Sequence, residues 1–175
     1  MDKNIVLIGF MAVGKTTVGT YLAAKSKMKF VDTDRLIEER YQLSVAEIFE
    51  KYGEEEFRKA EKQVAEELSQ KKKLVIATGG GMVKSQENMD FLRKNAVVVY
   101  LSSSVDKIIN NAGQTGKRPL LVGKTREQIV EMISQRQPYY EQCDLKIDVT
   151  HLTAQQTAGK ILSYYLKSGN EEKHG

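Results

Sequence analysis

The chain has 175 residues, of which 41% are hydrophobic and 29% are charged, and its net charge is +4. These values suit a single domain with a sizeable core, and the mild basic excess does not require nucleic acid as a partner. The single cysteine, Cys143, excludes an internal disulfide, and no apolar run is long enough to span a membrane. The N-terminus also lacks a signal-peptide pattern. We therefore expect a cytoplasmic protein that binds neither nucleic acid nor membranes.

Five apolar runs alternate with stretches of helical periodicity, which predicts a parallel sheet buried on both faces. Such alternation favours an α/β doubly wound fold, in which ligands bind at the carboxyl ends of the strands. The expected strands are residues 5–8, 28–31, 74–77, 96–101 and 145–149. Capping-box pairs mark helix starts at Ser44 with Glu47, Thr125 with Gln128, and Thr153 with Gln156.

The segment after the first strand, residues 9–17, has the sequence GFMAVGKTT. It matches the phosphate-binding pattern G-x-x-x-x-G-K-[ST] in the strand–loop–helix setting that the pattern requires. Backbone N–H groups of such a loop surround a phosphate, and the next helix directs its positive N-terminus toward it. Lys15 can reach the outer phosphates, and the Thr16 hydroxyl is placed for Mg²⁺. We therefore predict a nucleoside triphosphate site.

Two acids, Asp32 and Asp34, follow the second expected strand at the same edge of the sheet. One could bind Mg²⁺ through water while the other accepts the proton of a substrate hydroxyl, a role that contributes about 10²–10⁴-fold to a rate. Alternatively, Asp32 or Thr33 only caps the helix that begins near Arg35. The third strand ends in Ala77-Thr78-Gly79 rather than in the Asp of a Walker B strand. This favours a small-molecule kinase, whose metal-binding acid would be Asp32, over a motor-type ATPase.

Arg58 lies on a predicted helix whose other face is apolar, and it is either a solvated charge or a bidentate carboxylate ligand. Arg136, near the end of a later helix, is a second candidate carboxylate ligand. Three consecutive glycines, Gly79, Gly80 and Gly81, close the third strand. We interpret them as a place where a ligand meets bare backbone, or where a turn needs positive φ.

Two long segments interrupt the alternation. The residues between the second and third strands carry two or three predicted helices, and they could form a small subdomain over the edge of the sheet. Residues 110–124 are polar, glycine-punctuated and rich in Lys and Arg, which we interpret as a lid. Arg118 in this lid could neutralise charge on the phosphates, or it belongs to an exposed basic loop. We assign residues 1–167 to one domain and residues 168–175 to a flexible tail.

In this order and combination, the motifs resemble the shikimate kinase family of P-loop kinases, which have an adenylate-kinase-like fold. The resemblance implies ATP- and Mg²⁺-dependent phosphorylation of the 3-hydroxyl of shikimate in aromatic amino-acid biosynthesis. It also implies strand order 2-3-1-4-5 and a substrate-binding subdomain at residues 33–61, and we expect a monomer. The matching stretches are residues 9–17, 32–34, 57–61, 79–81 and 118–121, and Arg136 with Tyr140 and Asp144.

The resemblance also implies a role for each matching residue. Asp34, Lys15 and Arg118 would be catalytic, with Asp34 acting as base or orienter of the hydroxyl. Thr16 would bind Mg²⁺ directly, and Asp32 would bind it through water. The implied substrate-binding residues are Asp34, Arg58, Gly79, Gly80, Gly81 and Arg136. The implied ATP-binding residues are Ala12, Val13, Gly14, Lys15, Thr16, Thr17, Arg118 and, near the adenine, Gln156.

Two departures from the family pattern stand out. Many relatives have Gly where Ala12 stands, and we expect little loss because Ala is tolerated if φ is negative. Relatives commonly have an arginine that stacks on adenine where this chain has Asn110 and Asn111. Its absence predicts weaker nucleotide affinity or base selectivity, unless Lys117 substitutes in part.

Two other functions stay open. One is another kinase of this fold, acting on gluconate or a nucleoside monophosphate, because fold alone does not determine the substrate. The paired arginines and the glycine triplet favour a small carboxylate over a nucleotide base. The other is a nucleotide-binding switch without turnover, against which the presence of Asp34 and Arg118 argues.

Overall fold

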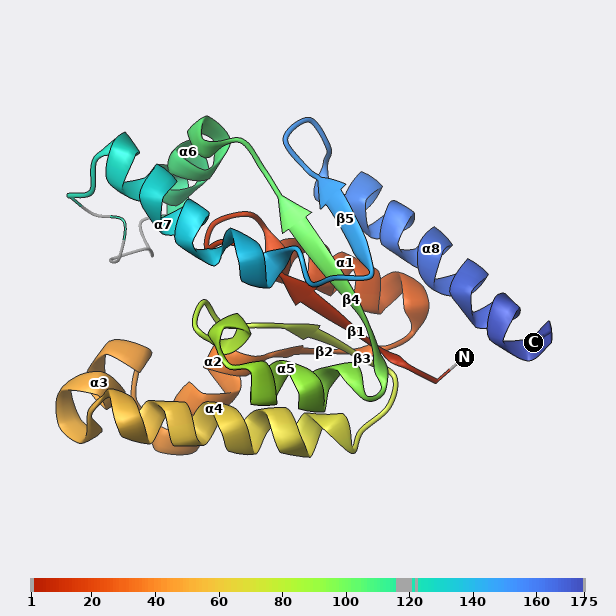
Figure 1. Ribbon diagram of the computed structural model, residues 1–175, viewed down its shortest axis with the longest axis horizontal. Coiled ribbons are helices and arrows are strands. Elements are labelled where there is room, and N and C mark those ends of the chain that lie inside the picture. Colours follow the sequence, from red (N-terminus) through yellow and green to blue (C-terminus); the bar gives the residue numbers. More distant parts are fainter. Residues whose placement is uncertain (1, 116–120, 122, 175) are drawn as a thin grey trace.

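The computed structural model of the chain describes residues 2–115, 121 and 123–174. Its five strands form one parallel sheet in the order β2-β3-β1-β4-β5, as expected (Figure 1). The strands are β1 (Asn4–Ile8), β2 (Lys29–Asp32), β3 (Leu74–Ala77), β4 (Ala96–Ser102) and β5 (Leu145–Asp148). The helices are α1 (Lys15–Ser26), α2 (Thr33–Tyr41), α3 (Val45–Tyr52), α4 (Glu54–Ser69), the 3₁₀ helix η1 (Met82–Lys84), α5 (Gln86–Arg93), α6 (Val105–Thr115), α7 (Arg126–Tyr140) and α8 (Ala154–His174).

Strand β1 lies at the centre of the sheet, between β3 and β4. Successive side chains of a strand point to opposite faces, and here both faces are covered by helices (Figure 1). Val6 and Ile8 pack in the core shared with α2 through α7, whereas Ile5 and Leu7 pack in the core shared with α1 and α8. The loop after β1 therefore leaves the carboxyl edge of a sheet that is fixed from both sides.

The predicted caps begin their helices. At α7, Gln128 donates its backbone N–H to the Thr125 hydroxyl at 3.2 Å, and Thr125 donates its N–H to the Gln128 side chain at 2.8 Å. The same two bonds join Thr153 and Gln156 at the start of α8. Ser44 accepts a bond from the first turn of α3 through its side chain. These local signals explain why the helix starts are readable from sequence.

Helix α6 is longer than we expected. The segment expected as a loop began at residue 110, but the helix continues to Thr115. Ile108 is buried, and Ala112 packs against the same core. Tertiary packing therefore extends the helix through polar residues that favour loops.

Helix α8 also continues past the expected end of the domain, because residues 168–174 are helical rather than irregular. Tyr165, one turn earlier, donates its hydroxyl to the Lys3 carbonyl at 2.7 Å and so ties this helix to the start of the chain. Within the part of the chain that the structure describes, no helix is long and apolar enough to cross a membrane.

Candidate functional site

The phosphate-binding loop joins β1 to α1 and depends on two glycines with positive φ. Gly9 has φ of 153°, and a Cβ atom there would lie 2.5 Å from the Leu101 carbonyl oxygen, so no other residue fits. Gly14 caps α1 with φ of 106°. Lys15, the first residue of α1, donates its Nζ to the carbonyls of Gly9 at 2.5 Å and Phe10 at 3.1 Å. The loop thus closes around its own lysine at a helix N-terminus.

Ala12 adopts a conformation that we did not expect, because its φ is +62° rather than negative. It is the third residue of a turn in which Val13 donates its N–H to the Phe10 carbonyl at 3.3 Å. A turn with positive φ at this position favours glycine. The left-handed conformation costs an alanine roughly 1–2 kcal/mol, so our expectation of an unstrained Ala12 was wrong.

Asp32 caps helix α2, which is one of the two roles that the sequence left open, and it also contacts Thr16. Its Oδ1 accepts the Arg35 N–H at 3.2 Å and so caps α2, while its Oδ2 accepts the Thr16 hydroxyl at 3.3 Å. Hydroxyl and carboxylate oxygens are the ligands that Mg²⁺ prefers. The described residues contain no group of three or more His, Cys, Asp or Glu that could hold a metal ion. A cation at this pair would therefore take its other ligands from phosphate and water.

Asp34 is placed against the backbone of Gly79. A Cβ atom on Gly79 would overlap the Asp34 carboxylate, so the missing side chain leaves room for that carboxylate. The Gly79 N–H is donated to the Thr33 hydroxyl at 2.8 Å, which ties the end of β3 to the start of α2. Thr33 was not among the predicted site residues, and its fully buried hydroxyl fixes the position of its neighbour.

The Asp34 carboxyl has an unusual acidity. Burial raises its pKa to about 6, and repulsion from Asp32 and Glu61 acts in the same direction, whereas Lys15 opposes it. The group is therefore largely ionised at neutral pH, yet it is a stronger base than an ordinary aspartate. Such a pKa suits a group that accepts a proton near neutral pH.

Gly80 and Gly81 make room for the two predicted arginines. A Cβ atom on Gly80 would lie 3.2 Å from Nη1 of Arg136, and one on Gly81 would overlap the Arg58 guanidinium. We expected the glycines to admit a ligand to bare backbone or to form a turn with positive φ. None of the three has positive φ, so the second alternative is wrong, and the contact with a ligand stays a prediction. Each glycine accommodates one side chain of the site, and three elements distant in sequence, α2, α4 and α7, converge on this segment.

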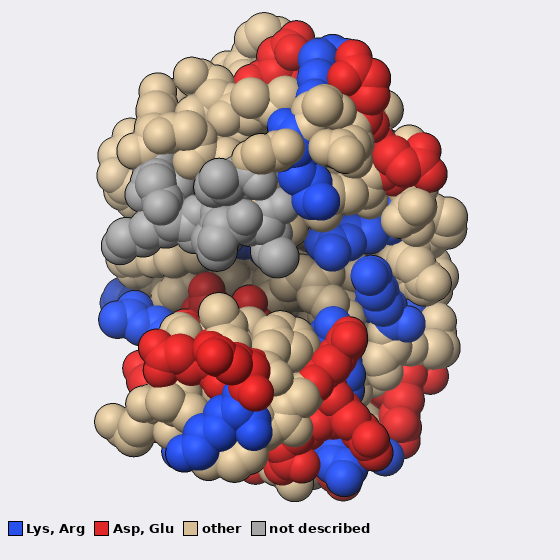
Figure 2. Space-filling view, turned by 90° about the vertical axis from the view of Figure 1, so that its left-hand side faces the viewer, with Lys and Arg blue, Asp and Glu red and all other residues tan. Residues whose placement is uncertain are grey.

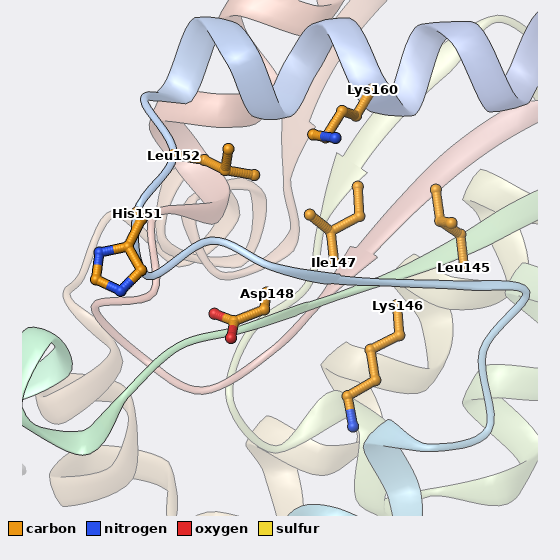
Figure 3. A pocket seen from close by; sticks show the side chains of 7 residues that line it. All are labelled: Leu145, Lys146, Ile147, Asp148, His151, Leu152 and Lys160. Carbon is orange, nitrogen blue, oxygen red and sulfur yellow. The ribbon is translucent and has the colours of Figure 1, made fainter.

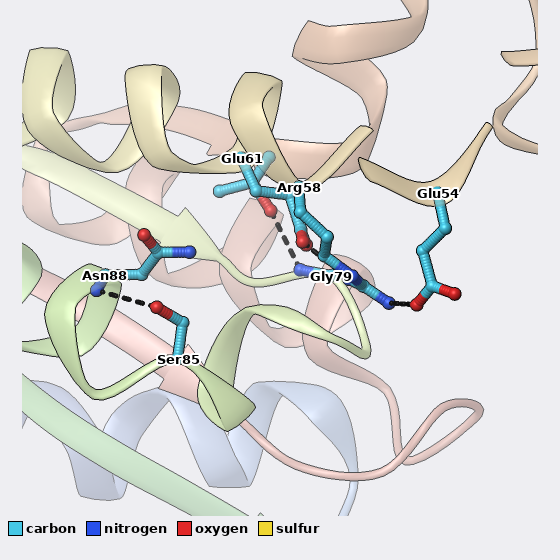
Figure 4. Close-up of polar contacts among 7 residues, drawn as sticks. Glu54, Arg58, Glu61, Gly79, Ser85 and Asn88 are labelled. Atoms are coloured by element: carbon cyan, nitrogen blue, oxygen red, sulfur yellow. Dashed lines mark hydrogen bonds and ion pairs between the residues drawn. The ribbon is translucent and has the colours of Figure 1, made fainter. Parts of the chain in front are cut away.

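Arg58 is held by two glutamates of its own helix (Figure 4). Its Nη1 donates to Oε1 of Glu61 at 2.5 Å, and its Nη2 donates to Oε1 of Glu54 at 3.1 Å. Glu61 is only 1% exposed, and burial raises its pKa although Arg58 opposes the shift. Arg58 is therefore an oriented guanidinium rather than a freely solvated charge. We had not assigned Glu61 a role, although its spacing of three residues from Arg58 predicts an ion pair on a helix.

Arg136 enters the site from α7 and lies 5.5 Å from the ring centroid of Phe10, as in a cation–π contact. Among the residues that the structure describes, its buried Nη1 has no hydrogen-bond partner, and neither has the buried hydroxyl of Tyr140, one turn later. An unpaired buried donor is unfavourable by about 1–3 kcal/mol, more when charged. An anion beside Gly80 would supply the missing acceptor. The contact with Phe10 was not predicted, because nothing in the sequence indicates it.

Some predicted residues do not enter this description. Arg118 and Lys117 lie outside the described residues. Gln156 is exposed and uses its side chain to cap α8, so its place near an adenine stays a prediction. Leu121, from the expected lid, is buried in the core that also contains Phe10.

A hollow opens on the side of the molecule that carries α3 and α7, with acidic side chains at its floor and both acidic and basic ones around the described part of its rim (Figure 2). A pocket of about 510 Å³ adjoins the site, and its lining includes Glu54, Arg58, Glu61 and Gly81. A second pocket, of about 520 Å³, lies between β5 and α8 and contains none of the predicted site residues (Figure 3). The chemistry therefore concentrates at the carboxyl edge of β1, β2 and β3.

Comparisons with known proteins agree with this geometry. A family model described as shikimate kinase matches residues 11–166. A shikimate kinase of Caldanaerobacter subterraneus subsp. tengcongensis is 45% identical over 166 residues, which cover 94% of this chain and 97% of the relative. A shikimate kinase of Thermodesulfovibrio yellowstonii is 44% identical over 169 residues, which cover 96% and 98%. The solved shikimate kinase from Acinetobacter baumannii in complex with shikimate is 36% identical with a TM-score of 0.87, and the match covers 95% of this chain and 94% of that one.

Proposed function

The chain belongs to the shikimate kinase family, and we propose that it transfers the γ-phosphoryl group of ATP to the 3-hydroxyl of shikimate. The observation that carries the proposal is the glycine segment after β3, which seats Asp34, Arg58 and Arg136 together. One base and two guanidinium groups beside a phosphate loop suit an acceptor that has both a hydroxyl and a carboxylate.

ATP would bind at the phosphate loop through Ala12 to Thr17. Lys15 would turn its ammonium group from the loop carbonyls toward the outer phosphates, where it offsets their negative charge. Thr16 and Asp32 would hold Mg²⁺, Thr16 directly and Asp32 through water, and the ion would supply further charge neutralisation. Their 3.3 Å contact supports this assignment, because it places two oxygen ligands side by side.

Shikimate would bind with its carboxylate between Arg58 and Arg136. Glu61 and Glu54 hold Arg58 in a defined orientation, and Nη1 of Arg136 has no acceptor within the described part of the chain. Charge-assisted hydrogen bonds to a carboxylate would fix the ring of the acceptor. Its hydroxyl would then lie near Asp34, at the neighbouring glycine.

In the transfer step, the 3-hydroxyl oxygen forms a bond to the γ-phosphorus while the bond to the β–γ bridging oxygen breaks. Asp34 accepts the hydroxyl proton, and ADP leaves with the electrons of the broken bond. Positioning and charge neutralisation then supply most of the rate enhancement. By resemblance, Arg118 would add positive charge from a lid at residues 110–124, and Gln156 would lie near the adenine. A monomeric state and a cytoplasmic location stay predictions.

The proposal is tested by measuring ADP release with ATP, Mg²⁺ and one acceptor at a time: shikimate, its methyl ester, gluconate or a nucleoside monophosphate. We expect turnover with shikimate and a much higher KM for the methyl ester, because the ester lacks the charge that Arg58 and Arg136 bind. Turnover with gluconate or the nucleotide, but not with shikimate, would contradict the proposal.

A further inference from the structure

The phosphate loop has a contact with helix α6 that the reaction chemistry does not explain. Asn111, on α6, donates its side-chain Nδ2 to the Ala12 carbonyl at 3.1 Å, across 99 residues of sequence. The same peptide group, between Ala12 and Val13, donates its N–H to the Phe10 carbonyl at 3.3 Å. One peptide plane of the loop is thus held at both of its polar ends.

This peptide plane directly follows Ala12, whose backbone conformation is unfavourable for its residue type. Ala12 has φ of +62°, a conformation that a glycine adopts readily and an alanine resists. Fixing the plane after Ala12 limits the rotations available to Ala12 and Val13. The next backbone N–H groups, those of Gly14 and Lys15, follow from this plane into the start of α1.

Helix α6 is fixed to the rest of the fold by hydrogen bonds and by apolar packing. Lys107, in its first turn, donates Nζ to the carbonyls of Val149 at 2.9 Å and Thr150 at 2.6 Å. Ile108 is buried in the same core as Ala12, so α6 and the loop also share apolar packing. An amide on this helix can therefore restrain the loop instead of moving with it.

We infer that Asn111 is a positioning residue for nucleotide binding, which holds the strained phosphate loop in its binding shape through the Ala12 carbonyl. The inference rests on the proposed function, because it needs the loop to bind ATP. Asn111 acts through the backbone of the loop and need not touch the nucleotide. Its effect therefore depends on which residue occupies position 12.

The test uses Asn111→Ala, with Asn170→Ala as the control, because Asn170 is an exposed asparagine of helix α8 and belongs to no predicted site. Calorimetric titration with MgADP, without shikimate, gives the nucleotide Kd of each variant. We expect Asn111→Ala to raise this Kd about 3- to 10-fold, the usual effect of losing one hydrogen bond. Asn170→Ala should leave the Kd within about twofold, and the KM for shikimate should be unchanged in both variants.

A second pair of variants separates loop positioning from a direct contact with the nucleotide. In an Ala12→Gly background, residue 12 adopts positive φ without help, so removing the Asn111 amide should raise the Kd by a smaller factor. An equal factor in both backgrounds, or an unchanged Kd in Asn111→Ala, would overturn the inference while leaving the proposed function intact. Failure of the unmodified chain to bind MgADP would overturn both.

Discussion

Replacing Asp34 with Asn should stabilise the protein while it removes activity. The folded-state pKa of about 6 lies above the ordinary value of 3.8, so the protein takes up a proton at this site on folding between these two pH values. Above about pH 6 the carboxylate is ionised in both states, and its burial then opposes folding. Raising a pKa from 3.8 to about 6 corresponds to about 3 kcal/mol, which we discount to about 1–2 kcal/mol because the group is only partly buried.

Urea unfolding of Asp34→Asn and the unmodified chain, at about pH 7.5 and about pH 4.5, measures this effect. We expect the variant to be the more stable by about 1–2 kcal/mol at the higher pH, with a smaller difference at the lower pH, where Asp34 is protonated in the folded state. Loss of the base should lower kcat by about 10²–10⁴-fold. The exposed Asp90→Asn is the control and should change stability by no more than about 0.5 kcal/mol. A less stable Asp34→Asn, or a difference independent of pH, would refute the reasoning.

Three further outcomes follow from the substrate side of the site. Arg136→Ala should raise the KM for shikimate about 10- to 100-fold, through the loss of a charge-assisted contact of about 1.5–3 kcal/mol; an unchanged KM in steady-state assays would remove Arg136 from the site. Gly81→Ala should also raise this KM and lower Tm, because the added Cβ would displace the Arg58 guanidinium from its pair with buried Glu61; an unchanged KM with an unchanged Tm by calorimetry would argue against this. In the unmodified chain, kcat/KM should fall as the pH is lowered through about 6, because Asp34 becomes protonated. Glu61→Gln should move this fall to lower pH, because it removes a repulsion that raises the Asp34 pKa. Coinciding pH profiles of the two proteins would be inconsistent with Asp34 as the base whose pKa Glu61 raises.

Local signals made much of the fold predictable. The phosphate loop, the helix caps and the apolar strands each depend on a few neighbouring residues, so they are visible in the sequence. The strand order came from the resemblance of the motifs to a family, and the sheet confirms it. Asp34, Arg58 and Arg136 were also identified in this way, and the structure brings all three to one segment.

What the sequence could not predict depends on contacts between distant elements. Residues 79–81 stand out in the sequence, but the side chains that they accommodate come from helices whose convergence only the folded chain reveals. The φ of Ala12 was mispredicted because it depends on the turn from Phe10 to Val13. The length of α6 was mispredicted because packing of Ile108 outweighs the local preference of its polar residues.

The central claim is that one site joins a phosphate loop to a carboxylate-binding acceptor pocket. Its most direct test is the rate of ADP release by the unmodified chain, with ATP and Mg²⁺, in the presence and absence of shikimate. We expect ADP release only when shikimate is present, with one shikimate 3-phosphate formed for each ADP. Release at the same rate without shikimate, or none in its presence, would contradict the claim.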